Sequence, residues 1–324
     1  MINLKPLKLS PAIKDYIWGG TRLSKEFDYV TYLDRQAEAW VLSCHEDGDC
    51  VIENSAFKGR TLRDVLSSDG KDYVGKNGEA FDSFPVLVKL IDAKDNLSLQ
   101  VHPCDDYAKK HENQNGKTEM WYILDCEEGS KLIYGLKRDV TKEEFKKAVN
   151  ENRVLECCNE VTVKKGDVFF IEAGTLHAIG KGILLAEVQQ NSNVTYRVYD
   201  YGRLQNGKPR ELHLEKALDV LNLKKTAAKE DYSPEPGKNG RTLLASCDVF
   251  TASRLDVEES ASVTADESSF VSLVALDGNG VLCFKDSVLT FYKGESIFLP
   301  AGLGTVEILG NMTVLETRCG KVEI

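Results

Sequence analysis

The fold is decided by the stretch Gly166-Asp167-Val168-Phe169-Phe170-Ile171-Glu172-Ala173-Gly174, which recurs as Gly294-Glu295-Ser296-Ile297-Phe298-Leu299-Pro300-Ala301-Gly302. Each copy opens with glycine and an acidic residue, continues as an apolar run and closes with Ala-Gly. The two glycines of a copy are eight residues apart. A repeated unit of strand and turn predicts two related β-barrels in tandem.

The two copies differ directly after their second glycine. The first continues Thr175-Leu176-His177, whereas the second continues Leu303-Gly304-Thr305-Val306, and no histidine follows His213. A catalytic site therefore belongs to the first barrel. We expect a catalytic domain over residues 1–232 and a metal-free, structural barrel over residues 240–324.

The surrounding sequence is also typical of an all-β protein. Short runs rich in β-branched and aromatic residues are separated by Gly and Asp turn signals, which favours antiparallel barrels over βαβ units. The clearest runs are residues 84–91, 120–124 and 182–188. Only a few short helices are expected, near residues 141–150, where Thr141 and Glu144 form a capping box, and near 211–222. The aperiodic stretch that ends at residues 233–240 is interpreted as a linker.

Charge and composition exclude several classes of protein. The 324 residues carry 51 acidic and 41 basic side chains, for a net charge of −10, so a nucleic-acid partner is not expected. We expect no membrane segment, because no run of 18 apolar residues is present, and a cytoplasmic location. None of the nine cysteines forms a C-x-x-C pair, which predicts reduced thiols.

One strand carries half of a possible metal site. In residues 97–103 the side chains of Ser98, Gln100 and His102 alternate with apolar residues, so they share one face of a strand. Gln and His two residues apart on one face suit a metal. By itself this pattern is weak, since a histidine on a surface strand is the more common explanation.

Two further segments complete the set of candidate ligands. Lys117 and Glu119 share a face if their segment is a strand, although an exposed ion pair is the favoured interpretation of this segment taken alone. His177 adds a second imidazole. Two imidazoles, one carboxylate and one amide oxygen would leave a bound Zn²⁺ with about one unit of positive charge, which makes it a useful Lewis acid.

A polar run from Glu187 to Asp200 is unusual for a strand that only fills a core. It is rich in amides and contains Arg197 between aromatic residues. Arginine suits a phosphate group, and aromatic residues with amides suit a sugar. The alternative is a polar barrel rim with a structural arginine.

These blocks resemble the signature segments of the type I phosphomannose isomerases of the cupin superfamily, in particular their short bacterial branch. The resemblance covers roughly residues 1–222 and rests on four blocks: Ser98-x-Gln100-Val101-His102-Pro103, Gly116-Lys117-Thr118-Glu119, Ala173-Gly174-Thr175-Leu176-His177-Ala178, and Glu187 through Arg197. It implies a mainly β fold of two cupin-type jelly-roll barrels. One departure is Ile179, where longer relatives have an aromatic residue.

The resemblance also implies the site residues. One zinc ion per chain would be held by Gln100, His102, Glu119 and His177. Arg197 would be the active-site arginine, and Lys117, Ser98 and Glu187 would line the pocket. The catalytic candidates are therefore Arg197, Lys117 and Glu187, and the substrate-binding candidates are Ser98, Lys117 and Arg197.

The implied reaction interconverts mannose 6-phosphate and fructose 6-phosphate by moving a proton between C1 and C2 through an enediol. The proton carrier stays open among Glu187, Lys117 and a zinc-bound water. Two rival functions remain: another metal-dependent cupin enzyme, such as an oxygenase, and a catalytically silent sugar-binding cupin. The partner is a small sugar phosphate, and a monomer or weak homo-oligomer is expected.

Overall fold

The repeated segment forms the same strand and turn in both halves of the chain. The computed structural model describes residues 4–68, 70–227, 232–237 and 240–322. In the first copy, Gly166 (φ 93°) precedes β12 (Val168–Ile171), and in the second Gly294 (φ 90°) precedes β22 (Ser296–Leu299). The left-handed backbone at both positions explains why both copies begin with glycine.

The first half consists of two antiparallel sheets. The six-stranded sheet has the order β12-β9-β14-β7-β3-β2 and the five-stranded sheet the order β11-β10-β13-β8-β15. The remaining strands of the first sheet are β9 (Glu119–Cys126), β14 (Ile183–Gln190), β7 (Val86–Ala93), β3 (Glu38–Leu42) and β2 (Ala12–Lys14). Those of the second are β11 (Cys158–Thr162), β10 (Lys131–Leu136), β13 (His177–Ile179), β8 (Leu99–Val101) and β15 (Tyr196–Tyr199).

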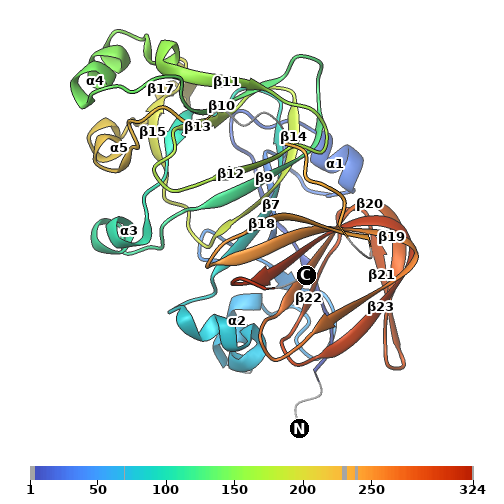
Figure 1. The fold of residues 1–324 in the computed structure, drawn as a ribbon. Coiled ribbons are helices and arrows are strands. Elements are labelled where there is room, and N and C mark those ends of the chain that lie inside the picture. The colour runs from blue at the N-terminus through green and yellow to red at the C-terminus, as the bar shows by residue number, and fades with distance from the viewer. Residues whose placement is uncertain (1–3, 69, 228–231, 238–239, 323–324) are drawn as a thin grey trace.

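The second half is built on one eight-stranded sheet of order β18-β19-β23-β20-β22-β1-β6, with β21 pairing β20. Its strands are β18 (Arg241–Ser246), β19 (Phe250–Ala265), β20 (Val271–Phe284), β21 (Ser287–Tyr292), β23 (Gly304–Cys319), β1 (Leu7–Ser10) and β6 (Val51–Ile52), with β22 as above. Figure 1 shows this orange-to-red half below the green and yellow first half. Strands β1 and β6, both from the first 52 residues, thus complete the sheet of the second half. The predicted division of the chain into domains at residues 232 and 240 therefore stays a proposal.

Two short ribbons and a few helices complete the chain. The ribbons are β4 (Cys44–His45) with β5 (Gly48–Asp49), and β16 (Leu204–Gln205) with β17 (Lys208–Pro209). The helices are α1 (Arg22–Phe27), α2 (Leu62–Ser68), α3 (Asp105–His111), α4 (Lys142–Asn150) and α5 (Leu214–Val220), with 3₁₀ turns at Lys71–Val74, Lys76–Ala80 and Val154–Cys157. Helices α3, α4 and α5 lie at the outer side of the five-stranded sheet (Figure 1).

The helix predictions are confirmed with shorter bounds. Thr141 Oγ1 accepts from the Glu144 backbone N–H at 3.1 Å while the Glu144 carboxylate accepts from the Thr141 N–H at 2.9 Å, so the capping box starts α4 as expected. Helix α5 covers only the middle of the segment predicted for it. The mainly β architecture of two jelly-roll halves is confirmed.

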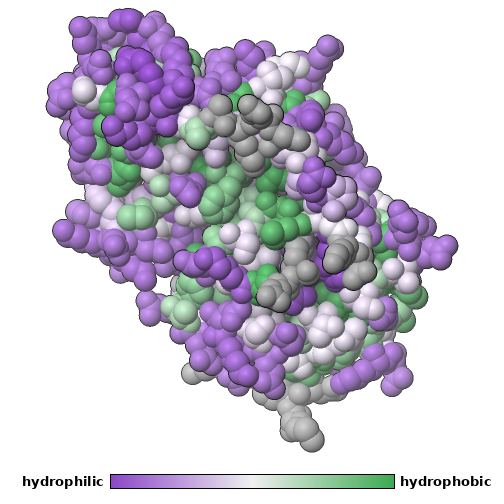
Figure 2. Space-filling view, viewed as in Figure 1, coloured by the Kyte–Doolittle hydropathy of each residue, from purple (hydrophilic) through white to green (hydrophobic). Residues whose placement is uncertain are grey.

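A shared hydrophobic core joins the halves. The ring of Phe84, from the segment before β7, lies 5.1 Å from that of Phe270, and Phe270 stacks on Phe298 of β22 at 5.2 Å. Figure 2 shows hydrophobic residues gathered near the middle of one face and hydrophilic residues around its margins. Among the described residues, no helix is both long enough and apolar enough to cross a membrane. All nine cysteines are free thiols.

Candidate active site

The register of the six-stranded sheet sets five side chains in one row. Trp40 on β3 pairs with Lys89 on β7, Lys89 with Glu187 on β14, Glu187 with Trp121 on β9, and Trp121 with Phe169 on β12. Cross-strand neighbours point to the same face of a sheet. Two ionised groups therefore lie between aromatic residues on the inner face.

The five-stranded sheet presents a second row. Arg197 on β15 pairs with Gln100 on β8, Gln100 with His177 on β13, and His177 with Tyr134 on β10. Three residues that the sequence marked as separate candidates are thus direct neighbours. The other strands and helices that lie between β8, β13 and β15 along the chain hide this adjacency in the sequence.

Ring contacts show that the two rows face each other. Tyr134 meets Phe169 with centroids 5.7 Å apart, and Trp121 meets His177 edge-on at 5.3 Å. These aromatic contacts close one end of the space between the sheets. The other end opens into a cavity of about 310 Å³.

Five predicted site residues line this cavity, together with five aromatic or charged residues that sequence reasoning missed. The predicted ones are Ser98, Gln100, Lys117, Glu187 and Arg197. The missed ones are Tyr16, Trp18, Glu38, Lys89 and Arg210. Lys89 had a visible signal, because it is the one charged residue in the otherwise apolar run at 84–91. Ile179, the departure from longer relatives, also lines the cavity.

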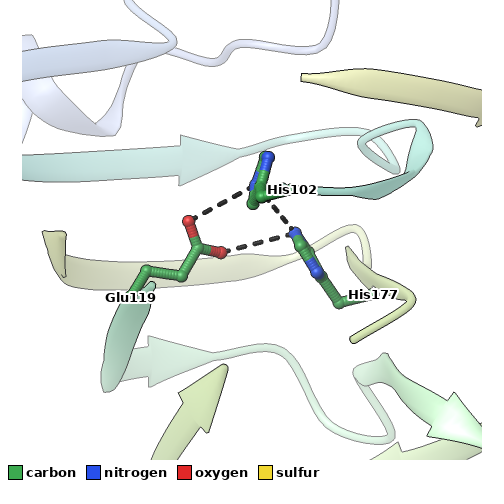
Figure 3. Close-up of side chains that lie close together, drawn as sticks. All are labelled: His102, Glu119 and His177. Atoms are coloured by element: carbon green, nitrogen blue, oxygen red, sulfur yellow. Dashed lines mark hydrogen bonds and ion pairs between the residues drawn. The ribbon is translucent and has the colours of Figure 1, made fainter. Parts of the chain in front are cut away.

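Next to Gln100 and Lys117, three buried side chains converge. The ligand atoms of His102, Glu119 and His177 all lie within 4.8 Å of one another. The two Nε2 atoms are 3.1 Å apart, and the Glu119 oxygens lie 3.5 Å from His102 Nε2 and 3.4 Å from His177 Nε2. Figure 3 shows the three side chains pointing toward a common centre. His102 follows β8 directly, Glu119 begins β9, and His177 begins β13.

Backbone carbonyls assign the tautomers of both histidines. His102 Nδ1 lies 2.9 Å from the carbonyl oxygen of Val194, and His177 Nδ1 lies 2.9 Å from that of Thr175. A carbonyl only accepts, so each Nδ1 carries the proton. In the neutral rings, each Nε2 therefore directs a lone pair at the common centre, as metal-binding histidines do.

The electrostatics of the cluster favour a cation. Burial, followed by the charge of Lys117, lowers the pKa of His177 to about 3 and holds the pKa of His102 well below its usual value. Burial, followed by the charge of Glu187, raises the pKa of Glu119 to about 7. Glu119 Oε1 has no hydrogen-bond donor among the described residues. Two bare imidazole nitrogens and an under-satisfied carboxylate fit a divalent metal.

Gln100 is placed to supply a fourth ligand. Its Nε2 lies 3.4 Å from His177 Nε2, and its Oε1 accepts from Ser98 Oγ at 3.4 Å. Oxygen and nitrogen of an amide are interchangeable in such an assignment. A half-turn of the amide directs the oxygen at the centre.

Lys117 contacts the same cluster. Its Nζ lies 2.7 Å from Glu119 Oε2 and 3.0 Å from His102 Nε2, and its side chain is buried. The reading of Lys117 and Glu119 as an exposed surface pair is therefore wrong. Strand β9 begins only at Glu119, so Lys117 lies just before it, yet both side chains point into the buried cluster.

An arginine cluster borders the cavity at Arg197. Asp200 Oδ1 accepts from Arg203 Nη2 and from Arg210 Nη2, each at 2.5 Å. Arg197 instead donates to neutral groups, the Ser98 hydroxyl at 3.3 Å and the Glu211 carbonyl at 2.8 Å. Burial, followed by the charge of Arg210, lowers the pKa of Arg197. The arginine cluster thus holds three guanidinium groups and one carboxylate. Its net positive charge suits a dianion such as a phosphate group.

Comparison with known proteins is consistent with this geometry. A family model described as "Phosphomannose isomerase type I, catalytic domain" matches residues 6–133, and one described as "Mannose-6-phosphate isomerase, cupin domain" matches residues 239–318. A mannose-6-phosphate isomerase of Bacillus subtilis is 38% identical over 312 residues, 95% of this chain and 97% of that protein. Another, of Streptococcus mutans, is 36% identical over 317 residues, 97% of this chain and 98% of that protein.

A solved structure agrees over the same length. The crystal structure of the mannose 6-phosphate isomerase from Bacillus subtilis matches with a TM-score of 0.88 and 36% identity, over 96% of this chain and 99% of that one. The match spans both halves, including the sheet that β1 and β6 complete. From its sequence, its fold and the buried cluster between its two inner rows, the chain belongs to the type I phosphomannose isomerase family.

Proposed function

We propose that the chain interconverts mannose 6-phosphate and fructose 6-phosphate, with a metal ion held at the buried cluster and the phosphate group at the arginine cluster. As a member of its family it is an aldose–ketose isomerase. The observation that carries the proposal is that one cavity is lined both by residues that contact the buried cluster and by residues of the arginine cluster. Gln100 and Lys117, which contact the buried cluster, line it together with Arg197 and Arg210 of the arginine cluster.

The metal is proposed to be one zinc ion per chain. His102, Glu119, His177 and Gln100 would hold it, a set of two nitrogens and two oxygens that zinc commonly takes. When bound, zinc would act as a Lewis acid that polarises hydroxyl and carbonyl oxygens of the substrate. The carbonyl bonds to both Nδ1 atoms keep the imidazoles in the ligating tautomer.

The phosphate group is proposed to bind at Arg197 and Arg210. Because the partners of Arg197 are neutral, its charge remains available for an anion. Ser98, which contacts both Arg197 and Gln100, lies between the two ends of the site. This arrangement would orient the sugar with C1 and C2 toward the metal-binding cluster.

The proton between C1 and C2 must be carried by a group that faces the cavity. Glu187, Lys117 and a zinc-bound water are the candidates from the sequence, and the structure adds Lys89, whose Nζ lies 2.9 Å from Glu187 Oε1. Burial opposes the charge of Glu187, but the nearby ammonium groups of Lys89 and Lys117 outweigh it and lower its pKa to about 2. Glu187 is thus held ionised, as a proton acceptor must be, although a carboxylate with so low a pKa is a weak base.

The direct test is a coupled assay for fructose 6-phosphate formed from mannose 6-phosphate, with unphosphorylated mannose as the comparison substrate. We expect turnover of the phosphate ester alone, loss of turnover after chelation, and recovery with added zinc. Metal-loaded, folded protein that forms no fructose 6-phosphate would contradict the proposal. Oxygen uptake by that protein would favour the oxygenase alternative, and sugar binding without turnover would favour the silent one.

The setting of the enzyme is part of the same proposal. A net charge of −10 gives no support for a nucleic-acid partner. We propose a cytoplasmic monomer or weak homo-oligomer that acts on a small sugar phosphate. Light scattering behind size exclusion at several concentrations measures the oligomeric state directly.

A further inference from the structure

Each of the three tryptophans of the chain either lines the cavity or contacts a residue that lines it. Trp18 lines it directly, while Trp40 and Trp121 are completely buried behind it. Each buried indole donates its N–H to a carboxylate: Trp40 to Glu38 at 2.6 Å and Trp121 to Glu187 at 2.9 Å. Two buried carboxylates of one site are thus each held by an indole.

The carboxylate of Glu187 is held at both oxygens. Its Oε2 accepts from Trp121 Nε1 at 2.9 Å, and its Oε1 lies 2.9 Å from Lys89 Nζ. Glu38 Oε2 lies 3.6 Å from the same ammonium group. The indole N–H on Oε2 and the ammonium group beside Oε1 together hold the Glu187 carboxylate in position.

Trp121 also contacts one candidate metal ligand, His177. Its ring meets the imidazole of His177 edge-on, with centroids 5.3 Å apart and an interplanar angle of 78°. On its other side it pairs with Phe169 in the strand ladder. A single rigid side chain thus lies between the metal-binding cluster and the ionised carboxylate.

The chemistry of indole suits this place. Its N–H is a donor only and does not titrate, so it cannot exchange protons with the carboxylate that it holds. A phenylalanine at the same position would keep most of the ring contact with His177 but would leave Glu187 Oε2 without this donor. Hydrogen bonds to charged groups are stronger than those between neutral groups, and losing one in a buried site is expensive.

We propose that Trp121 is a positioning residue of the isomerisation: its indole N–H holds Glu187 in the orientation in which that carboxylate serves the substrate. This inference rests on the proposed function. It separates two roles of one side chain, because the N–H acts on Glu187 and the ring acts on His177. The first role can be removed while the second is largely kept.

The kinetic test uses Trp121→Phe. We expect kcat to fall about 10- to 100-fold, as loss of a hydrogen bond to a charged group predicts, with KM changed less than about threefold and the metal content unchanged. Tyr29→Phe is the matched control, because it also removes one hydrogen bond from an aromatic side chain, here partly buried, to the Gly294 carbonyl, and neither residue lines the cavity. A kcat of Trp121→Phe equal to that of the control would overturn the proposal.

A double-mutant cycle tests whether the effect passes through Glu187. In a Glu187→Gln background, adding Trp121→Phe should lower kcat by less than about threefold, since the positioned carboxylate is already gone. Full multiplication of the two single effects would show that Trp121 acts independently of Glu187, and the proposal would be wrong.

A spectroscopic test works without any turnover. The three indole N–H groups give three ¹⁵N–¹H resonances, and the one missing in Trp121→Phe identifies Trp121. If Trp121→Phe does not fold, the same resonance is found by elimination from Trp18→Phe and Trp40→Phe. Glu187→Gln should shift the Trp121 resonance upfield and leave that of Trp18 in place. An unmoved Trp121 resonance would overturn the proposal, whereas absence of isomerase activity in the wild type would count against the proposed function alone.

Discussion

Lys117 Nζ lies 2.7 Å from Glu119 Oε2, inside the ligand cluster rather than on the surface. The same ammonium group lies 3.0 Å from His102 Nε2. A fixed positive charge therefore contacts two atoms that a metal ion would bind. It balances the buried carboxylate, but it also opposes the arrival of a second cation.

Removal of Lys117 should for this reason strengthen metal binding. We expect Lys117→Met to bind zinc on the order of 10-fold more tightly while its isomerase activity falls, because the competing charge is lost. Competition with a chelating dye measures the affinity. Lys131→Met, which removes an exposed ammonium group paired with Glu160, is the control and should bind zinc as the wild type does. Weaker zinc binding by Lys117→Met would show that Lys117 supports the metal site.

The ligands themselves should account for one metal per chain. His102→Ala and His177→Ala should each lose the metal and the activity, because each removes a bare Nε2 from the centre. Elemental analysis of purified protein gives the content. His111→Ala, at the exposed end of α3, is the control. Full metal content and activity in both ligand variants would refute the assignment.

The pH dependence of stability should reveal the Lys89–Glu187 pair. The folded-state pKa of Glu187 is lowered to about 2, so its stabilising contribution is complete above the unfolded value near 4.5 and is lost as pH falls from there toward 2. Lys89→Met should cost about 3–5 kcal/mol at pH 7, the usual cost of breaking a buried pair.

At pH 3.5 the loss of unfolding free energy caused by Lys89→Met should shrink by roughly 1 kcal/mol. Glu187 is then mostly protonated in the unfolded state, so the ion pair stabilises the folded wild type less than at pH 7. Urea unfolding of both proteins at the two pH values provides the comparison. Lys131→Met, whose surface pair contributes little, should show no such change. A penalty that stays constant or grows on acidification would contradict the assignment.

The repeated turn offers a stability test of the fold. Gly166 and Gly294 have nearly the same φ, so alanine should cost about 1–2 kcal/mol of backbone strain at either position. A Cβ at Gly166 meets nothing within 4 Å, whereas one at Gly294 lies 2.7 Å from the Phe27 carbonyl oxygen. Gly294→Ala should therefore destabilise more than Gly166→Ala in urea unfolding. Equal losses of stability would mean that the backbone at Phe27 moves away from the new Cβ at no cost in free energy.

Much of this fold could be predicted because its signals are local. The spacing of Gly166 and Gly174 defines a turn, and the histidine that follows the first copy marks the half that carries chemistry. The alternation of Ser98, Gln100 and His102 indicated a shared face even though the regular strand covers only Leu99–Val101.

The features that could not be predicted from the sequence depend on the register between distant strands. Trp40 and Lys89 are neighbours only through the pairing of β3 with β7, and no local pattern encodes that pairing. Arg210 lies thirteen residues after Arg197 and reaches the cavity because Asp200 holds it there. The use of β1 in the sheet of the second half is equally non-local, since its partner β22 is almost 290 residues away.

The two arginines that border the cavity should separate in their kinetics. Arg210 is held by two hydrogen bonds to Asp200, at 2.8 and 2.5 Å, so part of its charge is already neutralised. Arg197 donates to a hydroxyl and a carbonyl and keeps its full charge. Arg210→Ala should therefore mainly raise KM for mannose 6-phosphate, by about 10-fold, with kcat within a few-fold of the wild type.

Arg197→Ala should instead lower kcat and kcat/KM together by on the order of 10²-fold or more, as expected for a group that meets charge developing in the transition state. Arg197→Lys keeps the charge but loses the planar fork, so it should recover only part of the activity. Steady-state kinetics are compared at equal zinc content, with Tm measured for every variant. If Arg197→Ala melts early while its folded fraction isomerises normally, Arg197 supports the fold through Ser98 and the Glu211 carbonyl, and its catalytic assignment is wrong.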